Sequence, residues 1–168
     1  KLESVPVNHR YLTGEQFAKL TGVELPTYRL CHARDLFVFS TFTGLGRADL
    51  ANLTSENIVT EPDGSRWIHI ERQKTKAECH IKLLDIPSRI IDKYKGEGKD
   101  GKLFFVPATS SLCRSLKMIE EQCKLGCHLT FYMARHSFAT LICLGNGVPI
   151  ETISRMMGHS SIRTTQIY

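Results

Sequence analysis

The sequence lacks any uninterrupted apolar run close to the roughly 20 residues that a membrane-spanning helix needs. Internal repeats and low-complexity segments are absent, and no signal peptide is expected. These absences argue against an integral membrane protein, a secreted protein and a repeat architecture. The sequence therefore predicts a soluble protein of the cytoplasm.

A disulfide framework and a complete zinc motif are also absent. The six cysteines are dispersed, mostly inside apolar stretches, which is typical of reduced thiols. Cys123, Cys127 and His128 lie close enough together to suggest a metal site, but a second ligand pair with zinc-type spacing is missing. We therefore expect no bound metal.

The chain has enough apolar residues to form one substantial core. It contains 168 residues, of which 42% are hydrophobic, and this length is typical of a single domain. With 22 Lys and Arg against 17 Asp and Glu, the formal net charge is +5. This charge favours a polyanionic partner, although an ordinary soluble protein can carry the same excess.

Hydrophobic periodicity and helix-start signals predict a mainly helical chain. Thr13 and Gln16 have the spacing of a capping box that opens a helix to about residue 21. Pro26 is placed to open a second helix, whose apolar cluster at residues 36–39 indicates burial on nearly all sides. Further helices are expected at residues 47–53, after Pro87, and at residues 110–125, 130–144 and 149–157.

In the middle of the chain, the apolar pattern changes to the short runs that are typical of strands. Three antiparallel strands are expected near residues 58–59, 67–70 and 80–83, with turns at residues 62–64 and around residues 75–77. The sequence therefore predicts an α+β fold, mainly helical, with a small three-stranded antiparallel sheet inserted between helices.

Three residues near the end of the chain suit phosphoryl transfer on DNA. The hydroxyl of Tyr168 could attack a phosphodiester and form a phosphotyrosyl bond, but it needs neighbours that stabilise charge on the phosphate. Arg135 lies in an apolar helix where its guanidinium needs an anion, and His159 lies at a helix junction where its ring can face a cleft. Taken singly, each residue also fits a structural role.

Lys74 lies in a basic segment at the turn between two of the expected strands. The tip of a hairpin can enter a DNA groove, where a lysine could protonate a departing 5′-oxygen or neutralise a backbone phosphate. Arg72 and Lys76 in the same segment are candidate DNA contacts. A solvated basic turn is the alternative interpretation.

Four residues and two segments together closely resemble the catalytic domain of the tyrosine recombinases, the phage-integrase family. They are Lys74, Arg135, His159 and Tyr168 with residues 134–140 (ARHSFAT) and 157–161 (MGHSS). Residues 43–45 (TGL), followed by Asp49 and Leu50, are most similar to the first catalytic segment in integrases of conjugative transposons and related mobile elements. The resemblance implies that residues 1–168 are a C-terminal catalytic domain, with an N-terminal DNA-binding domain and a segment after Tyr168 outside this chain.

The resemblance also implies an activity: site-specific cleavage and rejoining of DNA strands in the integration or excision of a mobile element. It implies a 3′-phosphotyrosyl intermediate and no cofactor. In that scheme Tyr168 is the nucleophile, Arg135 binds the non-bridging oxygens, Lys74 is the general acid and His159 donates a hydrogen bond to the phosphate. The implied partners are double-stranded DNA, other recombinase subunits in a tetrameric synapse and accessory DNA-bending proteins, at the nucleoid in the cytoplasm of a bacterial cell.

Two positions depart from the family pattern. The arginine expected directly after TGL is Gly46, and Arg47 is a candidate substitute although one helical residue rotates a side chain by about 100°. Tyr132 replaces the histidine of the His-x-x-Arg motif, and with an unperturbed pKa of about 10 it is a poorer general base. Its hydroxyl can still donate a hydrogen bond to a phosphate oxygen. His136, next to Arg135, is a candidate DNA contact, with core packing as the alternative.

These departures leave two alternatives to a site-specific recombinase. The first is a recombinase-derived domain that binds DNA with weakened or lost cleavage. The second is topoisomerase-like relaxation, which uses the same chemistry without specific sites. The first alternative predicts DNA binding without covalent attachment of the chain to DNA. The second predicts relaxation of a plasmid without an attachment sequence.

Overall fold

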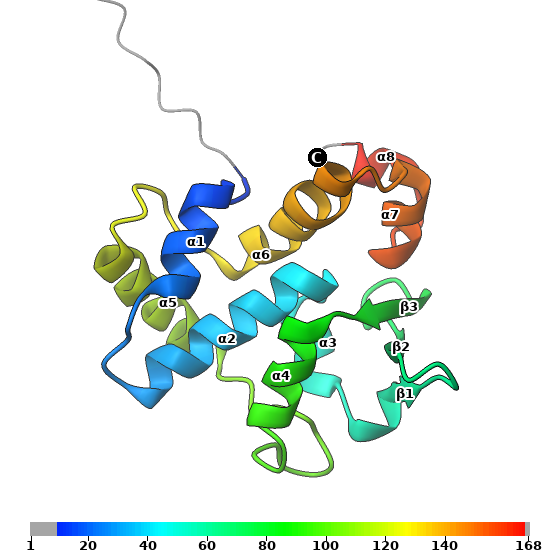
Figure 1. Cartoon of the computed structure of the whole chain (residues 1–168), viewed down its shortest axis with the longest axis horizontal. Coiled ribbons are helices and arrows are strands. Elements are labelled where there is room, and N and C mark those ends of the chain that lie inside the picture. The colour runs from blue at the N-terminus through cyan, green and yellow to red at the C-terminus, as the bar shows by residue number, and fades with distance from the viewer. Residues whose placement is uncertain (1–9, 167–168) are drawn as a thin grey trace, which may run out of the picture.

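The computed structural model describes residues 10–166, and helices form most of this part of the chain (Figure 1). The elements before the sheet are α1 (Gly14–Gly22), α2 (Tyr28–Thr43), α3 (Arg47–Asn52) and the 3₁₀ turn η1 (Ser55–Asn57). Those after it are α4 (Asp85–Lys93), α5 (Thr109–Cys123), α6 (Phe131–Ser137), η2 (Phe138–Cys143), η3 (Leu144–Asn146), α7 (Ile150–Met156) and α8 (Ile162–Thr165). Within residues 10–166, no helix combines the length and apolar composition needed to cross a lipid bilayer.

The long helix α2 runs through the centre of the molecule (Figure 1). Its side chains are buried on nearly all sides, as the sequence predicts. The predicted start at Pro26 is wrong, because the hydroxyl of Thr27 accepts a hydrogen bond from the Leu30 amide and caps the helix at that point. Gly44 ends α2 in the left-handed conformation, with φ +69°, and its amide donates to the Ser40 carbonyl.

The sheet has the strand order β1 (Ile58–Thr60), β2 (Arg66–Glu71) and β3 (Glu78–Leu83), and both pairings are antiparallel. Ile68 in the central strand pairs with Ile58 on one side and Ile81 on the other. Ile68 and Ile81 are buried on the face that packs against the helices. The predicted α+β fold with a three-stranded antiparallel insert is confirmed.

Three groups of buried apolar residues hold the elements together. One joins α1, α2, α5 and the start of α6, and a second joins α2, α3, the sheet and α4. The third, around Phe138 and Ile153, joins η2 to α7. Because α2 takes part in the first two groups, it connects the α1 and α5 end of the molecule to the end that carries the sheet, α7 and α8 (Figure 1).

The single helix predicted over residues 130–144 is wrong in its second half. Helix α6 ends at Ser137 and continues as the π-helical turn η2 and then as the 3₁₀ turn η3. A π turn places more residues in each turn than an α turn. In this arrangement Phe138, Ala139 and Cys143 all lie in the third apolar group, and packing rather than local propensity sets the geometry.

Candidate active site

A cavity of about 490 Å³ brings together most of the residues that the sequence analysis selected. It lies where α3, the β2–β3 hairpin, α6 and the chain after α7 meet. Its lining consists of Gly46, Arg47, Ala48, Asp49, Arg72, Gln73, Lys74, Thr75, Tyr132, Arg135, Met157, His159, Ser160 and Thr164. The predicted nucleophile, Tyr168, lies outside the described residues.

Arg135 reaches the cavity from α6 and is held by main-chain carbonyls. Its Nη1 donates to the Gly44 carbonyl at 3.2 Å and its Nη2 donates to the Met157 carbonyl at 2.7 Å. Gly44 can approach η2 because it has no side chain: a Cβ there would lie 2.6 Å from the ring of Phe138. The guanidinium is therefore fixed in orientation before any anion arrives.

The ring of His159 lies beside the guanidinium of Arg135. Its Nε2 is 3.1 Å from Arg135 Nη2 and its Nδ1 is 2.7 Å from the hydroxyl of Thr165. An arginine can only donate, so Nε2 accepts this bond and the ring carries its proton on Nδ1. Burial, followed by the positive charges of Arg135 and Arg72, lowers the pKa of His159 to about 4. The imidazole is therefore neutral at pH 7 in the absence of DNA.

The depressed pKa of His159 makes folding stability depend on pH. The imidazole titrates near 6.5 in the unfolded chain and near 4 in the folded one, so the unfolded chain binds more protons between these values. We expect acidification from pH 6.5 to 4 to lower the free energy of unfolding by about 1–3 kcal/mol through this residue. Urea titrations at several pH values should show a shallower loss for His159→Gln; an unchanged slope would contradict the assignment.

The β2–β3 hairpin carries Lys74 to the edge of the cavity. Lys74 is exposed, and the neighbouring hydroxyl of Thr75 donates to the Gly158 carbonyl at 2.8 Å. This bond ties the hairpin tip to the segment that carries His159. Lys76 is also exposed and lies 3.7 Å from the Glu71 carboxylate.

Arg72, which the sequence analysis selected as a candidate DNA contact, is buried. Only 3% of its side chain is exposed, and its Nη1 lies 3.0 Å from the carboxylate of Asp49. The cause is strand alternation, because Arg72 follows Ile68 and Ile70 at a spacing of two and so turns towards the buried face. The same alternation, applied to the sequence, would have indicated this position.

Gly46 stands at the position where the family pattern places its first arginine, and the space beside it is empty of protein atoms. Gly46 caps α3, and a Cβ built there would meet no atom within 4 Å. Arg47, the candidate substitute, is the first residue of α3 and lines the cavity. Its guanidinium is held by the Pro107 carbonyl, which accepts from Nε at 3.1 Å and from Nη2 at 2.6 Å.

Tyr132 and His136 lie one helical turn apart on α6 and have opposite exposures. Tyr132 is 61% exposed and lines the cavity. His136 is buried, at 2% exposure, and its ring packs edge-on against Tyr132 with the centroids 4.4 Å apart. The burial of His136 favours the alternative of core packing, and its contact with DNA stays a prediction.

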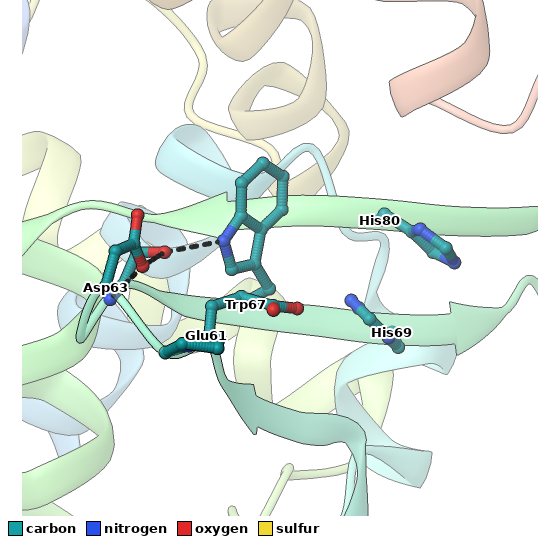
Figure 2. Close-up of a pocket in the computed structure, with 7 residues that line it drawn as sticks. Glu61, Asp63, Trp67, His69 and His80 are labelled. Carbon is teal, nitrogen blue, oxygen red and sulfur yellow. Dashed lines mark hydrogen bonds between the residues drawn. The ribbon is translucent and has the colours of Figure 1, made fainter.

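A second cavity, of about 510 Å³, lies on the outer face of the sheet (Figure 2). The rings of His69 and His80 stack there with their centroids 4.1 Å apart, and the indole of Trp67 donates to Ser65. Its charged lining is acidic, consisting of Glu61 and Asp63. Because its lining supplies carboxylates instead of guanidiniums or ammonium groups, this cavity suits a phosphate poorly.

This chain is similar to known proteins in sequence and in fold. The family model described as "Phage integrase family" matches residues 10–168. The chain belongs to the phage integrase family. Among curated relatives of this integrase-family domain, the tyrosine recombinase XerA of Saccharolobus solfataricus is 32% identical over 127 residues, covering 75% of this chain and 41% of the relative. XerA of Thermococcus onnurineus is 29% identical over 170 residues, covering 94% of this chain and 56% of the relative.

Solved structures have the same fold at lower identity. The XerH site-specific recombinase bound to its difH substrate matches with a TM-score of 0.77 and 20% identity, covering 96% of this chain and 50% of that one. The Tn1549 transposon integrase in complex with a circular intermediate DNA matches with a TM-score of 0.70 and 18% identity, covering 94% and 60%. This integrase-family domain spans about half the length of the curated relatives it matches.

Proposed function

We propose that this chain is the catalytic part of a tyrosine-type site-specific recombinase that cuts and rejoins double-stranded DNA. The observation that carries the proposal is the convergence of Arg135, His159 and Lys74 on one cavity, from three separate segments. The names of similar proteins support it. The curated relatives are tyrosine recombinases, and the similar solved structures include a site-specific recombinase and a transposon integrase bound to DNA. Integration or excision of a mobile element is the proposed setting, and the nucleoid of a bacterial cell the proposed location.

In the proposed reaction, the cavity holds the scissile phosphate while the hydroxyl of Tyr168 attacks it and releases its proton to solvent water. A phosphotyrosyl bond to the 3′ side forms as the bond to the 5′-oxygen breaks. Arg135 stabilises the charge on the non-bridging oxygens, and its fixed guanidinium needs little rearrangement to do so. Lys74, exposed on the hairpin, donates a proton to the departing 5′-oxygen.

His159 needs a change of protonation to fulfil its proposed role. In the DNA-free protein its Nε2 accepts a hydrogen bond from Arg135, so this nitrogen carries no proton for a phosphate oxygen. A phosphate placed beside the ring would favour the charged imidazolium. We therefore expect His159 to take up a proton, or to exchange its tautomer, when DNA binds.

Strand exchange requires more than one active site, so we propose that the protein acts as an assembly of subunits on DNA. A tetrameric synapse is the proposed form, with accessory DNA-bending proteins as further partners. Sedimentation of the protein on DNA that carries its attachment sequence tests this assembly. A single subunit on each DNA under conditions that support recombination would contradict it.

Covalent trapping tests the proposed cleavage. The DNA is a pool of duplexes with randomised sequence and one nick, in which loss of a short fragment traps the covalent intermediate. The full natural chain that carries residues 1–168 should form a protein–DNA adduct, and sequencing of the trapped DNA should reveal a preferred site. Tyr168→Phe should form no adduct. An adduct that persists in this variant would remove the proposed nucleophile.

The same assay separates the alternatives. Salt-dependent DNA binding by the wild-type protein without any adduct would favour a binding domain. The reason for this alternative is Gly46, which has no side chain where the family pattern places an arginine. Relaxation of a plasmid that lacks the trapped sequence would favour topoisomerase-like activity.

Tyr132→His is expected to leave strand cleavage unchanged or to increase it. The position is exposed at the edge of the cavity, so the smaller ring can be accommodated without disturbing the core. Histidine is also the residue that the family pattern places there, and it is the better base near neutral pH. Initial rates on the trapped sequence measure the effect. A large loss would mean that the site depends on the Tyr132 hydroxyl.

A further inference from the structure

The proposed cleavage requires positive charge on more than one side of the phosphate, yet Gly46 provides none at the usual position. We propose that Arg72, directly after β2, supplies the second guanidinium of the phosphate site, in place of a residue at position 46. This inference rests on the proposed function. It assigns a catalytic role to a residue that the sequence analysis selected as a DNA contact.

The guanidiniums of Arg72 and Arg135 donate hydrogen bonds to the same or adjacent main-chain carbonyls. Nη1 of Arg72 donates to the Gly44 carbonyl at 3.4 Å, and Nη1 of Arg135 donates to the same oxygen at 3.2 Å. Nη2 of Arg72 donates to the Met156 carbonyl, and Nη2 of Arg135 donates to the next carbonyl, that of Met157, both at 2.7 Å. Arg72 and Arg135 thus lie on either side of one oxygen and both line the cavity.

The hydrogen bonds of Arg72 leave one donor for a ligand. Nε donates to Cys79 Sγ, and the two Nη1 hydrogens go to Gly44 and to Asp49. Nη2 has two hydrogens, and one of them goes to Met156. Among the described residues, the second Nη2 hydrogen has no hydrogen-bond acceptor, so it can bind a phosphate oxygen.

Neighbouring residues fix the orientation of the Arg72 side chain, as they do for Arg135. Asp49 accepts from Arg72 through one carboxylate oxygen and from the Gln73 amide through the other, at 3.0 Å in each case. Gly158 lets the stem of Arg72 approach, because a Cβ there would lie 2.6 Å from Arg72 Cγ. The charge of Arg72 also contributes to the lowered pKa of His159, so its field reaches the site.

The other nearby cations fit this role less well. Arg47 directs Nε and Nη2 to the Pro107 carbonyl, so it would have to give up both bonds to turn. Lys76 is exposed on the hairpin and pairs with Glu71. Only Arg72 shares an acceptor with Arg135 among the described arginines.

The test compares Arg72→Met, which keeps most of the apolar stem but removes the charge, with Arg114→Met, an exposed control on α5. It uses the full natural chain and the DNA sequence recovered by trapping. We expect Arg72→Met to slow cleavage by about 10²-fold or more, as loss of one preorganised donor does in other active sites, and the control to keep the wild-type rate. Thermal unfolding of each variant shows whether the fold is retained.

Two further measurements separate a catalytic role from a structural one. Adding Gly46→Arg to Arg72→Met should restore cleavage at least tenfold, because the open space at position 46 admits the usual arginine. A scissile phosphate in which a methyl group replaces one charged oxygen should reduce the defect of Arg72→Met, since less charge then needs stabilisation.

Each outcome bears on one of the two proposals. Wild-type cleavage by Arg72→Met would overturn the role of Arg72 while leaving the proposed function intact. An equal defect on charged and neutral phosphates, without rescue by Gly46→Arg, would assign Arg72 to the structure alone. Absence of any Tyr168-dependent adduct with the wild-type protein would instead overturn the proposed function.

Discussion

Arg135→Ala is expected to lower the rate of strand cleavage by about 10²–10³-fold, because it removes a preorganised donor that no other described residue of α6 can replace. The guanidinium is already oriented by the Gly44 and Met157 carbonyls in the DNA-free protein, so the loss falls on the chemical step. Binding of DNA should weaken much less, since it depends on many phosphate contacts.

Single-turnover cleavage and equilibrium DNA binding, measured on the same duplex, check this prediction. Arg89→Ala is a suitable control because Arg89 is exposed on α4, outside the cavity. It should match the wild type in cleavage. If Arg135→Ala cleaved within tenfold of the wild-type rate, the cavity around Arg135 could not be the site of phosphoryl transfer.

Gly44→Ala is expected to lower the free energy of unfolding by about 2–4 kcal/mol, the sum of left-handed backbone strain and overpacking. The residue has φ +69°, and an added Cβ would lie 2.6 Å from the ring of Phe138. Relief of this clash would move α2 away from η2 and displace the carbonyl that Arg72 and Arg135 share. Cleavage should therefore fall together with stability.

Gly46→Ala is the matched control for Gly44→Ala. It lies two residues along the chain, has φ −77° and a Cβ there would meet nothing within 4 Å. It should change the free energy of unfolding by less than about 1 kcal/mol, because alanine is a poorer N-cap for α3 than glycine but restricts the unfolded chain more. Urea unfolding curves provide the comparison. Equal stabilities for the two variants would show that Gly44 tolerates a side chain.

Helix caps and turns that depend on residues close together in the sequence could be predicted from the sequence. The capping box of Thr13 and Gln16 is present, and residues around Asp63 and Thr75 form the two predicted turns. The second half of the helix after Thr130 could not be predicted, because its π turn depends on packing against α7. Pro26 was a weaker start signal than the hydroxyl of Thr27 that follows it.

The candidate site was only partly predictable for a similar reason. Arg135, His159 and Lys74 could be selected because each lies in a recognisable segment, and the structure brings all three to one cavity. The environment of Arg72 depends on Asp49, Gly44 and Met156, which lie far from it in sequence. The ion pair and main-chain contacts that bury this arginine exist only in the folded chain.

The acceptor that Arg72 and Arg135 share is a main-chain carbonyl, that of Gly44. An acceptor of this kind is kept by any substitution that preserves the local backbone, whereas an arginine can be lost by a single codon change. A cation that disappears from α3 can accordingly be replaced by one from a strand that already reaches the same oxygen. On the proposed role of Arg72, a search that requires arginine directly after TGL would miss domains of this kind, while a count of guanidiniums around this oxygen in folded structures would retain them.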